Sequence, residues 1–201
     1  MSVAQLLAAL SSPDPTPGGG TAAAIAGAMG ASLLVMVTGL AKSKSNADDE
    51  KAALARARGA LEPMPARLMQ LADADSDAFN AVMSAYRLPK ASDEDKAART
   101  RAIQAALRGA TETPLQTLRA CVAALEHARP VAEFGNASAA SDVGVAIGLL
   151  RAAADGAAAN VQINLGSVKD ATFVETTRAE LSALTAAAAS HAADASRLLS
   201  L

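Results

Sequence analysis

Three aspartates at alternate positions form the pattern in this sequence that is most typical of catalysis. They lie in the segment Asp73-Ala-Asp-Ser-Asp-Ala-Phe79, where Asp75 precedes Phe79 by four residues. Positions i and i+4 share one face of a helix, so an inward Phe79 turns Asp75 inward too, where a carboxylate needs a partner or a cationic ligand. Such a carboxylate can stabilise a cation and accept a proton from water. Asp75 is the first candidate catalytic residue and Asp77 the second; the alternative is that all three acids are solvated.

A glycine-rich turn is the second candidate site. Gly18, Gly19 and Gly20 follow Pro15-Thr-Pro17 and precede a long uncharged segment. The residues before the glycines predict helix and turn, and no Gly-Lys-Ser/Thr follows, so neither a dinucleotide fingerprint nor a Walker loop fits. A glycine-rich helix start still offers unpaired N–H groups to a ligand that approaches the backbone closely. We expect Thr16 and the three glycines to contact a ligand; the alternative is a turn that only begins a tightly packed helix.

A third set of polar residues lies at and after the loop of Gly135 and Asn136. Asn136, Ser141 and Asp142 are residue types that begin helices, and they can cap a helix or hydrogen-bond a ligand. Asn160 and Asn164 lie one helical turn apart further along, where amides either join helices or bind a polar ligand. The spacing leaves both interpretations open.

The remaining reactive residue types give no site. His127 and His191 lack a second ligand-like residue at helical spacing, so no metal site is expected. Cys121 has no adjacent basic residue, and we expect it to pack as a small apolar group.

Six helical regions are expected to position these residues. Prolines 63 and 65 are expected to kink or split the third region, and Pro114 to bend the fourth. Ser92 is the predicted N-cap of the fourth region, and Asp170 is that of the last region. The expected regions are Val3–Leu10, glycines 18–20 to about Lys42, Asp49–Tyr86, Ser92 to about His127, Ala139–Leu165, and Asp170 to the C-terminus.

Composition predicts an all-α protein. Of the 201 residues 51% are hydrophobic but only 2% aromatic, and alanine, the strongest helix former, is abundant. We expect one domain, residues 1–201, built as a bundle of long, roughly antiparallel helices. The net charge of −2 argues against a nucleic-acid surface. The uncharged run from Gly18 to Ala41 is long enough to span a membrane, but its alanines and glycines favour a helix buried in a bundle. One cysteine and no basic N-terminal region predict a cytoplasmic protein without a membrane segment.

Three motifs occur in an order that resembles the cyclodeaminase/cyclohydrolase family of tetrahydrofolate enzymes. They are Pro15-Thr-Pro-Gly-Gly-Gly20, then Asp75-Ser-Asp-Ala-Phe79 with Ala85-Tyr-Arg-Leu-Pro-Lys90, then Gly135-Asn136 with Ser141-Asp-Val-Gly-Val-Ala146. Together they extend over nearly the whole chain. The stretch from Leu88 to Arg99 is most similar to the stand-alone cyclohydrolases of this family. The chain is too short to contain the transferase half of the bifunctional relatives as well.

The resemblance implies an all-helical homodimer that binds folate beside the glycine turn, with no cofactor or metal besides the tetrahydrofolate substrate, whose tail has one or several glutamates. The implied reaction is hydrolysis of 5,10-methenyltetrahydrofolate to 10-formyltetrahydrofolate. The alternative activity is that of a formimidoyltetrahydrofolate cyclodeaminase, which releases ammonia. Alternatives of another class are a non-catalytic helical bundle that binds a partner and a folate-binding protein without turnover.

The resemblance also implies a role for each candidate residue. Asp75, and after it Asp77, acts at the cationic methenyl carbon, while Thr16 and the backbone of Gly18–Gly20 hold the folate. Lys44 and Lys90 are expected to bind the anionic glutamate. The pterin is expected to be oriented by hydrogen bonds from Asn136, Ser141 and Asp142. Relatives often have a Lys-rich run ending in an aromatic after the second helix, whereas Lys42-Ser-Lys-Ser-Asn46 is thinner and has no aromatic.

Overall fold

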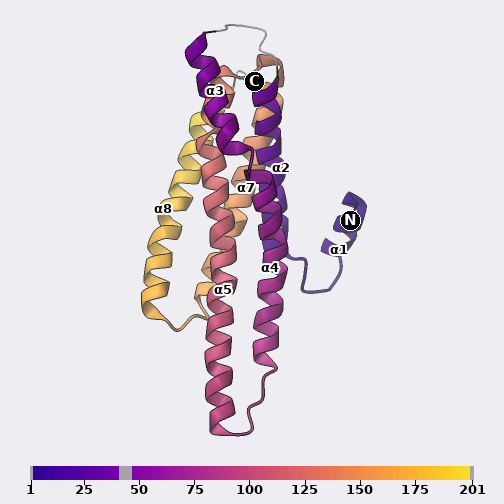
Figure 1. The fold of residues 1–201 in the computed structure, drawn as a ribbon, viewed down its shortest axis with the longest axis vertical. Helices are drawn as coiled ribbons and strands as arrows, with labels where there is room; N and C mark the ends of the chain where they lie inside the picture. Colours follow the sequence, from indigo (N-terminus) through magenta and orange to yellow (C-terminus); the bar gives the residue numbers. More distant parts are fainter. Residues whose placement is uncertain (1, 41–46, 200–201) are drawn as a thin grey trace.

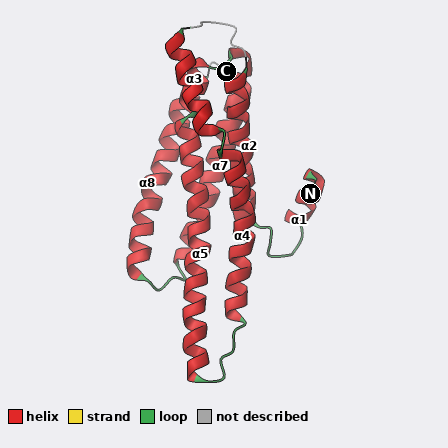
Figure 2. Ribbon diagram, viewed as in Figure 1, coloured by secondary structure: helices red, strands yellow, loops and turns green. Residues whose placement is uncertain are grey.

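The protein is a bundle of long, roughly antiparallel α-helices, and the predicted all-α class is confirmed (Figures 1 and 2). The computed structural model describes residues 2–40 and 47–199, and no strand occurs among them. The elements are α1 (Val3–Leu10), α2 (Gly19–Gly39), α3 (Asp48–Leu61), α4 (Met64–Tyr86), α5 (Asp93–Glu126), α6 (Ala128–Phe134), the 3-10 turn η1 (Ala137–Ala139), α7 (Ala140–Leu165) and α8 (Ala171–Ser196).

Local sequence sets most helix boundaries. Ser92 forms a capping box with Asp95 at the start of α5, and Asp170 accepts a hydrogen bond from the N–H of Phe173 at the start of α8. The segment with Pro63 separates α3 from α4, as predicted. Helix α6 was not predicted, because it begins directly after His127, where α5 ends, and no glycine-rich or polar linker marks the break.

The closest helix pairing is that of α2 with α7, which forms the most extensive contact in the bundle. A Cβ atom at Gly30 would lie 2.8 Å from the carbonyl oxygen of Ala146 and 2.8 Å from Cγ of Leu150. At Gly27 it would lie 3.0 Å from Sγ of Cys121. Glycines thus let the α2 backbone approach its neighbours, so the uncharged segment is a helix packed within the bundle.

Fully buried leucines from α2, α3, α4, α5 and α7 fill the centre of the bundle. Since few aromatic side chains are available, these leucines and many buried alanines supply the apolar area that stabilises the fold. The leucines with no exposed surface are Leu34, Leu61, Leu68, Leu118, Leu125 and Leu150.

Among the residues that the structure describes, two helical stretches are long and apolar enough to cross a membrane by length and composition. They are Gly19–Gly39 and Ala137–Leu165, and the most apolar window of the first is 50% buried inside the protein. Because α2 and α7 form the most extensive helix contact in the bundle, each provides much of the other's apolar surroundings.

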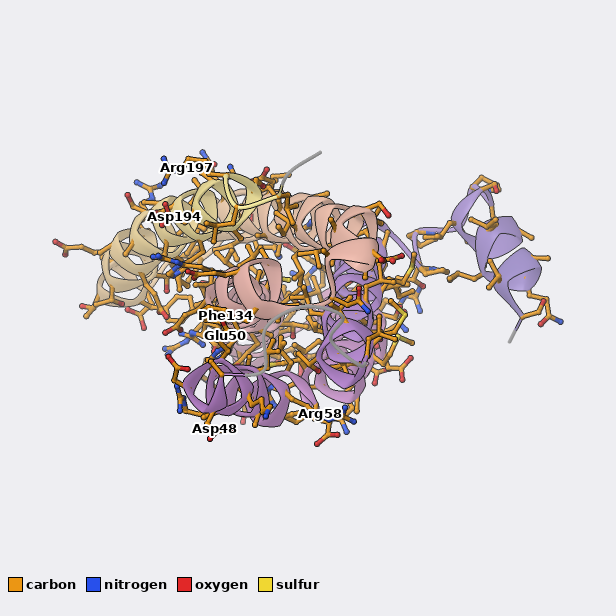
Figure 3. The ribbon with its side chains drawn as sticks, turned by 90° about the horizontal axis from the view of Figure 1, so that it is seen from above. Asp48, Glu50, Arg58, Phe134, Asp194 and Arg197 are labelled. Carbon is orange, nitrogen blue, oxygen red and sulfur yellow. The ribbon has the colours of Figure 1, made fainter. Side chains whose placement is uncertain are left out.

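Helix α1 stands apart from the bundle. Figures 1 and 3 both place it to the side of the body, joined to α2 by an extended connection. None of its residues is buried; Val3 is 74% and Leu7 is 59% exposed.

The glycine at position 30 is predicted to be required for stability. In Gly30→Ala the new methyl group meets the backbone of Ala146, and overpacking costs about 1–3 kcal/mol, more than the roughly 1 kcal/mol gained in helix propensity. Gly109→Ala is the matched control, because nothing lies within 4 Å of its Cβ position in α5, and it should gain about 0.5–1 kcal/mol. Urea denaturation measures both. Equal stability of the two variants would contradict the close approach of α2 and α7.

Candidate functional site

A cavity of about 270 Å³ lies where the start of α2 meets α4, α5 and α7. It joins the glycine turn to side chains from three helices. Its lining residues are Pro15, Thr16, Gly18, Gly19, Gly20, Asp75, Ala78, Phe79, Val82, Leu107, Ala110, Asn160 and Asn164. The fold therefore brings together the glycine turn and Asp75, which the sequence analysis singled out separately.

Asp75 faces the first turn of α2. Thr21 Oγ1 donates a hydrogen bond to Asp75 Oδ2 at 3.0 Å, and Thr21 is itself only 6% exposed. A Cβ atom at Gly20 would lie 2.2 Å from Asp75 Oδ1, so the absence of a side chain at Gly20 is what lets the carboxylate reach the helix backbone. Phe79 lines the same cavity, in agreement with the shared helix face predicted for the two residues.

The charge of Asp75 is not neutralised inside the protein. Within residues 2–40 and 47–199, its hydrogen-bond donor is a neutral hydroxyl, and none of the ion pairs includes it. A half-buried carboxylate without a cation favours a ligand that brings a positive charge.

The start of α2 provides donors beside this carboxylate. Gly18 is the N-cap and makes no side-chain capping bond, so the first-turn N–H groups of the helix have no capping side chain. Donors of this kind bind anionic or carbonyl oxygens of a ligand.

Asn160 and Asn164 present amides from α7 on the opposite wall. Asn164 Nδ2 donates to the carbonyl oxygen of Ala110 at 2.7 Å, and Asn160 Nδ2 donates to that of Gly156 at 2.8 Å. The Asn164 amide nitrogen thus joins α7 to α5, while that of Asn160 bonds within α7, and in the described part of the chain neither Oδ1 accepts a hydrogen bond. The two oxygens remain acceptors for a ligand with N–H groups.

Other predicted site residues do not line this cavity. Asp77 is exposed on α4, and Lys90 is exposed in the α4–α5 connection. Lys44 lies outside the described residues. A role of these three side chains in binding or catalysis stays a prediction.

Asn136, Ser141 and Asp142 lie at the other end of the α2–α7 pair. The neighbouring Gly135 approaches Val37, which is 18 residues, or about 27 Å along the helix, from Gly19. Asn136 caps η1, its Oδ1 accepting from the N–H of Ser138 at 2.9 Å, and Asp142 lies in the first turn of α7. Within one chain these three residues are therefore separate from the cavity.

Several lining residues were not predicted from the sequence. Val82, Leu107 and Ala110 provide apolar walls, and Thr21 holds Asp75. The one local signal for Thr21 was its position directly after the glycine turn. The apolar walls had no local signal, because they depend on how α5 packs against α4.

Cys121 and the strongest ion pairs are structural. Burial raises the pKa of the Cys121 thiol to about 12, so the thiol is protonated at neutral pH and is not a nucleophile. Glu180 accepts two hydrogen bonds from Arg119, at 2.7 Å each, and this pairing lowers the pKa of Glu180. Neither group lines the cavity, and no cluster of three metal-ligating residues occurs in the described part of the chain.

Comparison with known proteins gives consistent matches over most of the chain. A family model described as formiminotransferase-cyclodeaminase matches residues 2–183. The chain is 44% identical over 179 residues to a methenyltetrahydrofolate cyclohydrolase of Methylorubrum extorquens, and the match covers 89% of this chain and 86% of that protein.

Two further relatives are cyclodeaminases. The chain is 36% identical over 177 residues to the formimidoyltransferase-cyclodeaminase of Rattus norvegicus, and the match covers 88% of this chain and 33% of the rat protein. The crystal structure of formiminotetrahydrofolate cyclodeaminase from Thermotoga maritima matches with a TM-score of 0.86 at 29% identity, covering 99% of this chain and 96% of that one.

The pKa of Cys121 leads to a direct chemical prediction. With a pKa of about 12, roughly one thiol in 10⁴ is ionised at pH 8, and the side chain is buried. The folded protein should therefore be almost inert to a disulfide reagent such as DTNB, while the same protein in urea reacts at the rate of a free thiol. Rapid reaction of the folded protein would contradict the packing of Cys121.

Proposed function

The chain belongs to the formiminotransferase-cyclodeaminase family, and on that premise we propose that it hydrolyses 5,10-methenyltetrahydrofolate to 10-formyltetrahydrofolate. The observation that carries this proposal is the Asp75 carboxylate, which faces a ligand-sized cavity without a cationic partner among the described residues. The substrate supplies the missing positive charge, because its methenyl carbon bridges N5 and N10 as a delocalised cation.

The proposed reaction needs one carboxylate that acts in two ways. Asp75 first stabilises the cation electrostatically, and it then accepts a proton from the water whose oxygen bonds to the methenyl carbon. The resulting tetrahedral carbon carries a hydroxyl group. The N5–carbon bond breaks, N5 takes up a proton, the hydroxyl loses its own, and the formyl group stays on N10.

The surroundings of Asp75 suit a folate ring system. The amide oxygens of Asn160 and Asn164 accept hydrogen bonds, which matches the N–H groups of a reduced pterin. The turn of Thr16 and Gly18–Gly20 gives close backbone contact, and Phe79 and Leu107 provide apolar walls. A binding role for Asn136, Ser141 and Asp142 remains a prediction from the family resemblance, since one chain keeps them away from this cavity.

The deaminase reaction is the second candidate. It passes through the same tetrahedral carbon, with N10 attacking a formimino carbon on N5 and ammonia leaving, so the same carboxylate serves both reactions. The higher identity to the cyclohydrolase, 44% against 36% for the rat cyclodeaminase, favours hydrolysis. Absorbance of methenyltetrahydrofolate and release of ammonia, measured on the same preparation, separate the two. If the protein gives neither signal, the remaining alternative is a helical bundle that binds folate or a partner without turnover.

Asp75→Asn is predicted to lower kcat by about 10² to 10⁴, the usual range for loss of a general base, because it removes charge and basicity while keeping size. Asp73→Asn is the matched control, since Asp73 is exposed two residues away on the same helix and has no assigned role. It should keep wild-type turnover and the same helical circular dichroism. A control variant as impaired as Asp75→Asn, or a fully active Asp75→Asn, would count against the assignment.

We also propose a cytoplasmic setting, without metal, further cofactor, nucleic acid or membrane partner. The lack of a metal-ligating cluster among the described residues and the net charge of −2 support this. The mutual packing of α2 and α7 supports a role for both helices inside a bundle.

The assembly that we propose is a homodimer that uses α2. An uncharged groove of about 690 Å³ lies on the faces of α2, α4 and α7, and Met29, Met69 and Val145 on it are 52%, 46% and 55% exposed. Its remaining lining is formed by Ile25, Ala28, Ser32, Leu33, Met36, Pro65, Ala66 and Leu149. An apolar groove of this extent favours contact with another apolar surface.

Helix α1 offers such a surface. Val3, Leu6, Leu7 and Leu10 follow the i, i+3, i+4, i+7 spacing and form one apolar stripe on a helix with no buried residue. An isolated helix of 8 residues is not stable in water without tertiary contacts. A second copy of the chain has the same groove and the same apolar stripe. In a dimer with two-fold symmetry, the stripe of each copy can therefore pack on the groove of the other. We propose that α1 packs on the groove face of the partner.

Leu7→Glu tests this arrangement. Burial of one leucine contributes about 1.5–3 kcal/mol, and a dimer has two arms, so the dissociation constant should rise by at least about 100-fold. Ala8→Glu is the control, because it puts the same charge at the next position on the opposite side of α1. Sedimentation velocity over a concentration series reports both. A monomeric wild type at tens of micromolar would contradict the dimer, and equal effects of the two substitutions would contradict docking through the stripe.

A further inference from the structure

A second, more polar cavity of about 400 Å³ adjoins the Asp75 cavity. The two share Leu107 on α5, and the second cavity continues toward the start of α5. It lies between the end of α4, the first turns of α5 and the α7–α8 connection. The lining residues are Tyr86, Arg99, Thr100, Ile103, Gln104, Leu107, Ser167 and Lys169.

The two charged residues that line this cavity are both cations. Arg99 and Lys169 line it, no carboxylate does, and neither cation takes part in an ion pair in residues 2–40 and 47–199. Nearby arginines differ in this respect: Arg108 pairs with Asp170 at 2.8 Å, and Arg119 pairs with Glu112 and Glu180. Two cations without carboxylates favour an anionic ligand.

Arg99 is held in place by neutral partners. Its Nε and Nη2 donate to the carbonyl oxygen of Tyr86 at 3.2 and 3.0 Å, and its guanidinium lies 5.7 Å from the Tyr86 ring. These contacts orient the group without cancelling its charge, and they leave further N–H donors for a carboxylate.

Gln104 fixes the segment that carries Lys169. Its Oε1 accepts from the backbone N–H of Lys169 at 2.7 Å, and its Nε2 donates to the carbonyl oxygen of Ser167 at 3.3 Å. Both cations therefore start from backbone positions that are tied to α5. An anion site held in this way loses less conformational freedom when a ligand binds.

We infer that this second cavity binds the glutamate end of the folate whose pterin occupies the Asp75 cavity, with Arg99 and Lys169 taking its carboxylates. This inference rests on the proposed function. Arg99 lies 8 residues, or about 12 Å, from Leu107 along α5, so an extended ligand reaches both groups. Ile103, between them, offers apolar contact to the aromatic ring that links pterin and glutamate. Lys90, the cation expected for this role from the family resemblance, lines neither cavity.

Calorimetric binding to wild type, Arg99→Gln and Lys169→Gln tests the inference without requiring turnover. The ligands are tetrahydrofolate with one glutamate and tetrahydropteroate, which lacks the glutamate. Each substitution should weaken tetrahydrofolate binding by about 10-fold or more, the loss expected for one charge-assisted contact, and leave tetrahydropteroate binding within about twofold. In the enzymatic assay KM should rise while kcat holds, because neither residue reaches the methenyl carbon.

Arg101→Gln is the matched control, since Arg101 is exposed on the same helix, lines neither cavity and changes the net charge equally. It should bind both ligands like wild type. Equal weakening by Arg99→Gln and Arg101→Gln would mean general electrostatic attraction, and equal loss of both ligands in Lys169→Gln would mean a structural effect; either result overturns the site. A wild type that binds folate through these cations but does not turn over would instead overturn the proposed reaction.

Discussion

The close antiparallel packing of α2 on α7 is the constraint from which the rest of the molecule follows. Gly30 lies against Ala146 and Leu150, and a Cβ atom at Gly156 would lie 3.3 Å from Cβ of Ala23. Side chains at these glycines would push the helices apart. Because glycine and alanine recur along both helices, one register is fixed over the length of the pair, and that register places Gly19 beside Asn160.

That register assembles the site at one end of the pair and separates it from the other end. The start of α2 meets the amides of α7, while α4, packed on α2, brings Asp75 to within hydrogen-bonding distance of Thr21. The polar residues of the turn before α7 are carried to the far end of α2 by the same packing. The polar groups that line the cavity and the Asp75 carboxylate thus come from segments of the chain that only the bundle brings together.

The charges along α5 divide into those used by the fold and those left for a ligand. Arg119 pairs with Glu112 within α5 and with Glu180 on α8, and Arg108 pairs with Asp170 at the start of α8, so two of these pairs join α5 to α8. Within the part of the chain that the structure describes, Asp75 at one cavity and Arg99 at the next have only neutral partners. A substrate with a cationic centre at one end and carboxylates at the other complements both, which is the electrostatic order expected for an elongated folate.

Much of the fold follows from local sequence. Alanine-rich composition, the Ser92 and Asp170 caps and the prolines near residue 63 predict the class and nearly all helix ends, because these are effects within one or two turns. Helix α6 was missed because its start carries no break signal of its own. The inward face of Asp75 was also predictable, since helical spacing ties it to Phe79.

Tertiary packing alone decided which candidate residues meet. Helical spacing says which side of a helix a residue faces, but it does not say which residues of another helix lie opposite. For that reason the sequence pointed to Lys90 and not to Arg99 or Lys169, and it could not show that Asn160 lines the Asp75 cavity while Asn136 does not. The register of α2 on α7 and the packing of α5 on α4 distinguish them, because contacts between distant segments depend on how glycine and alanine let the backbones approach.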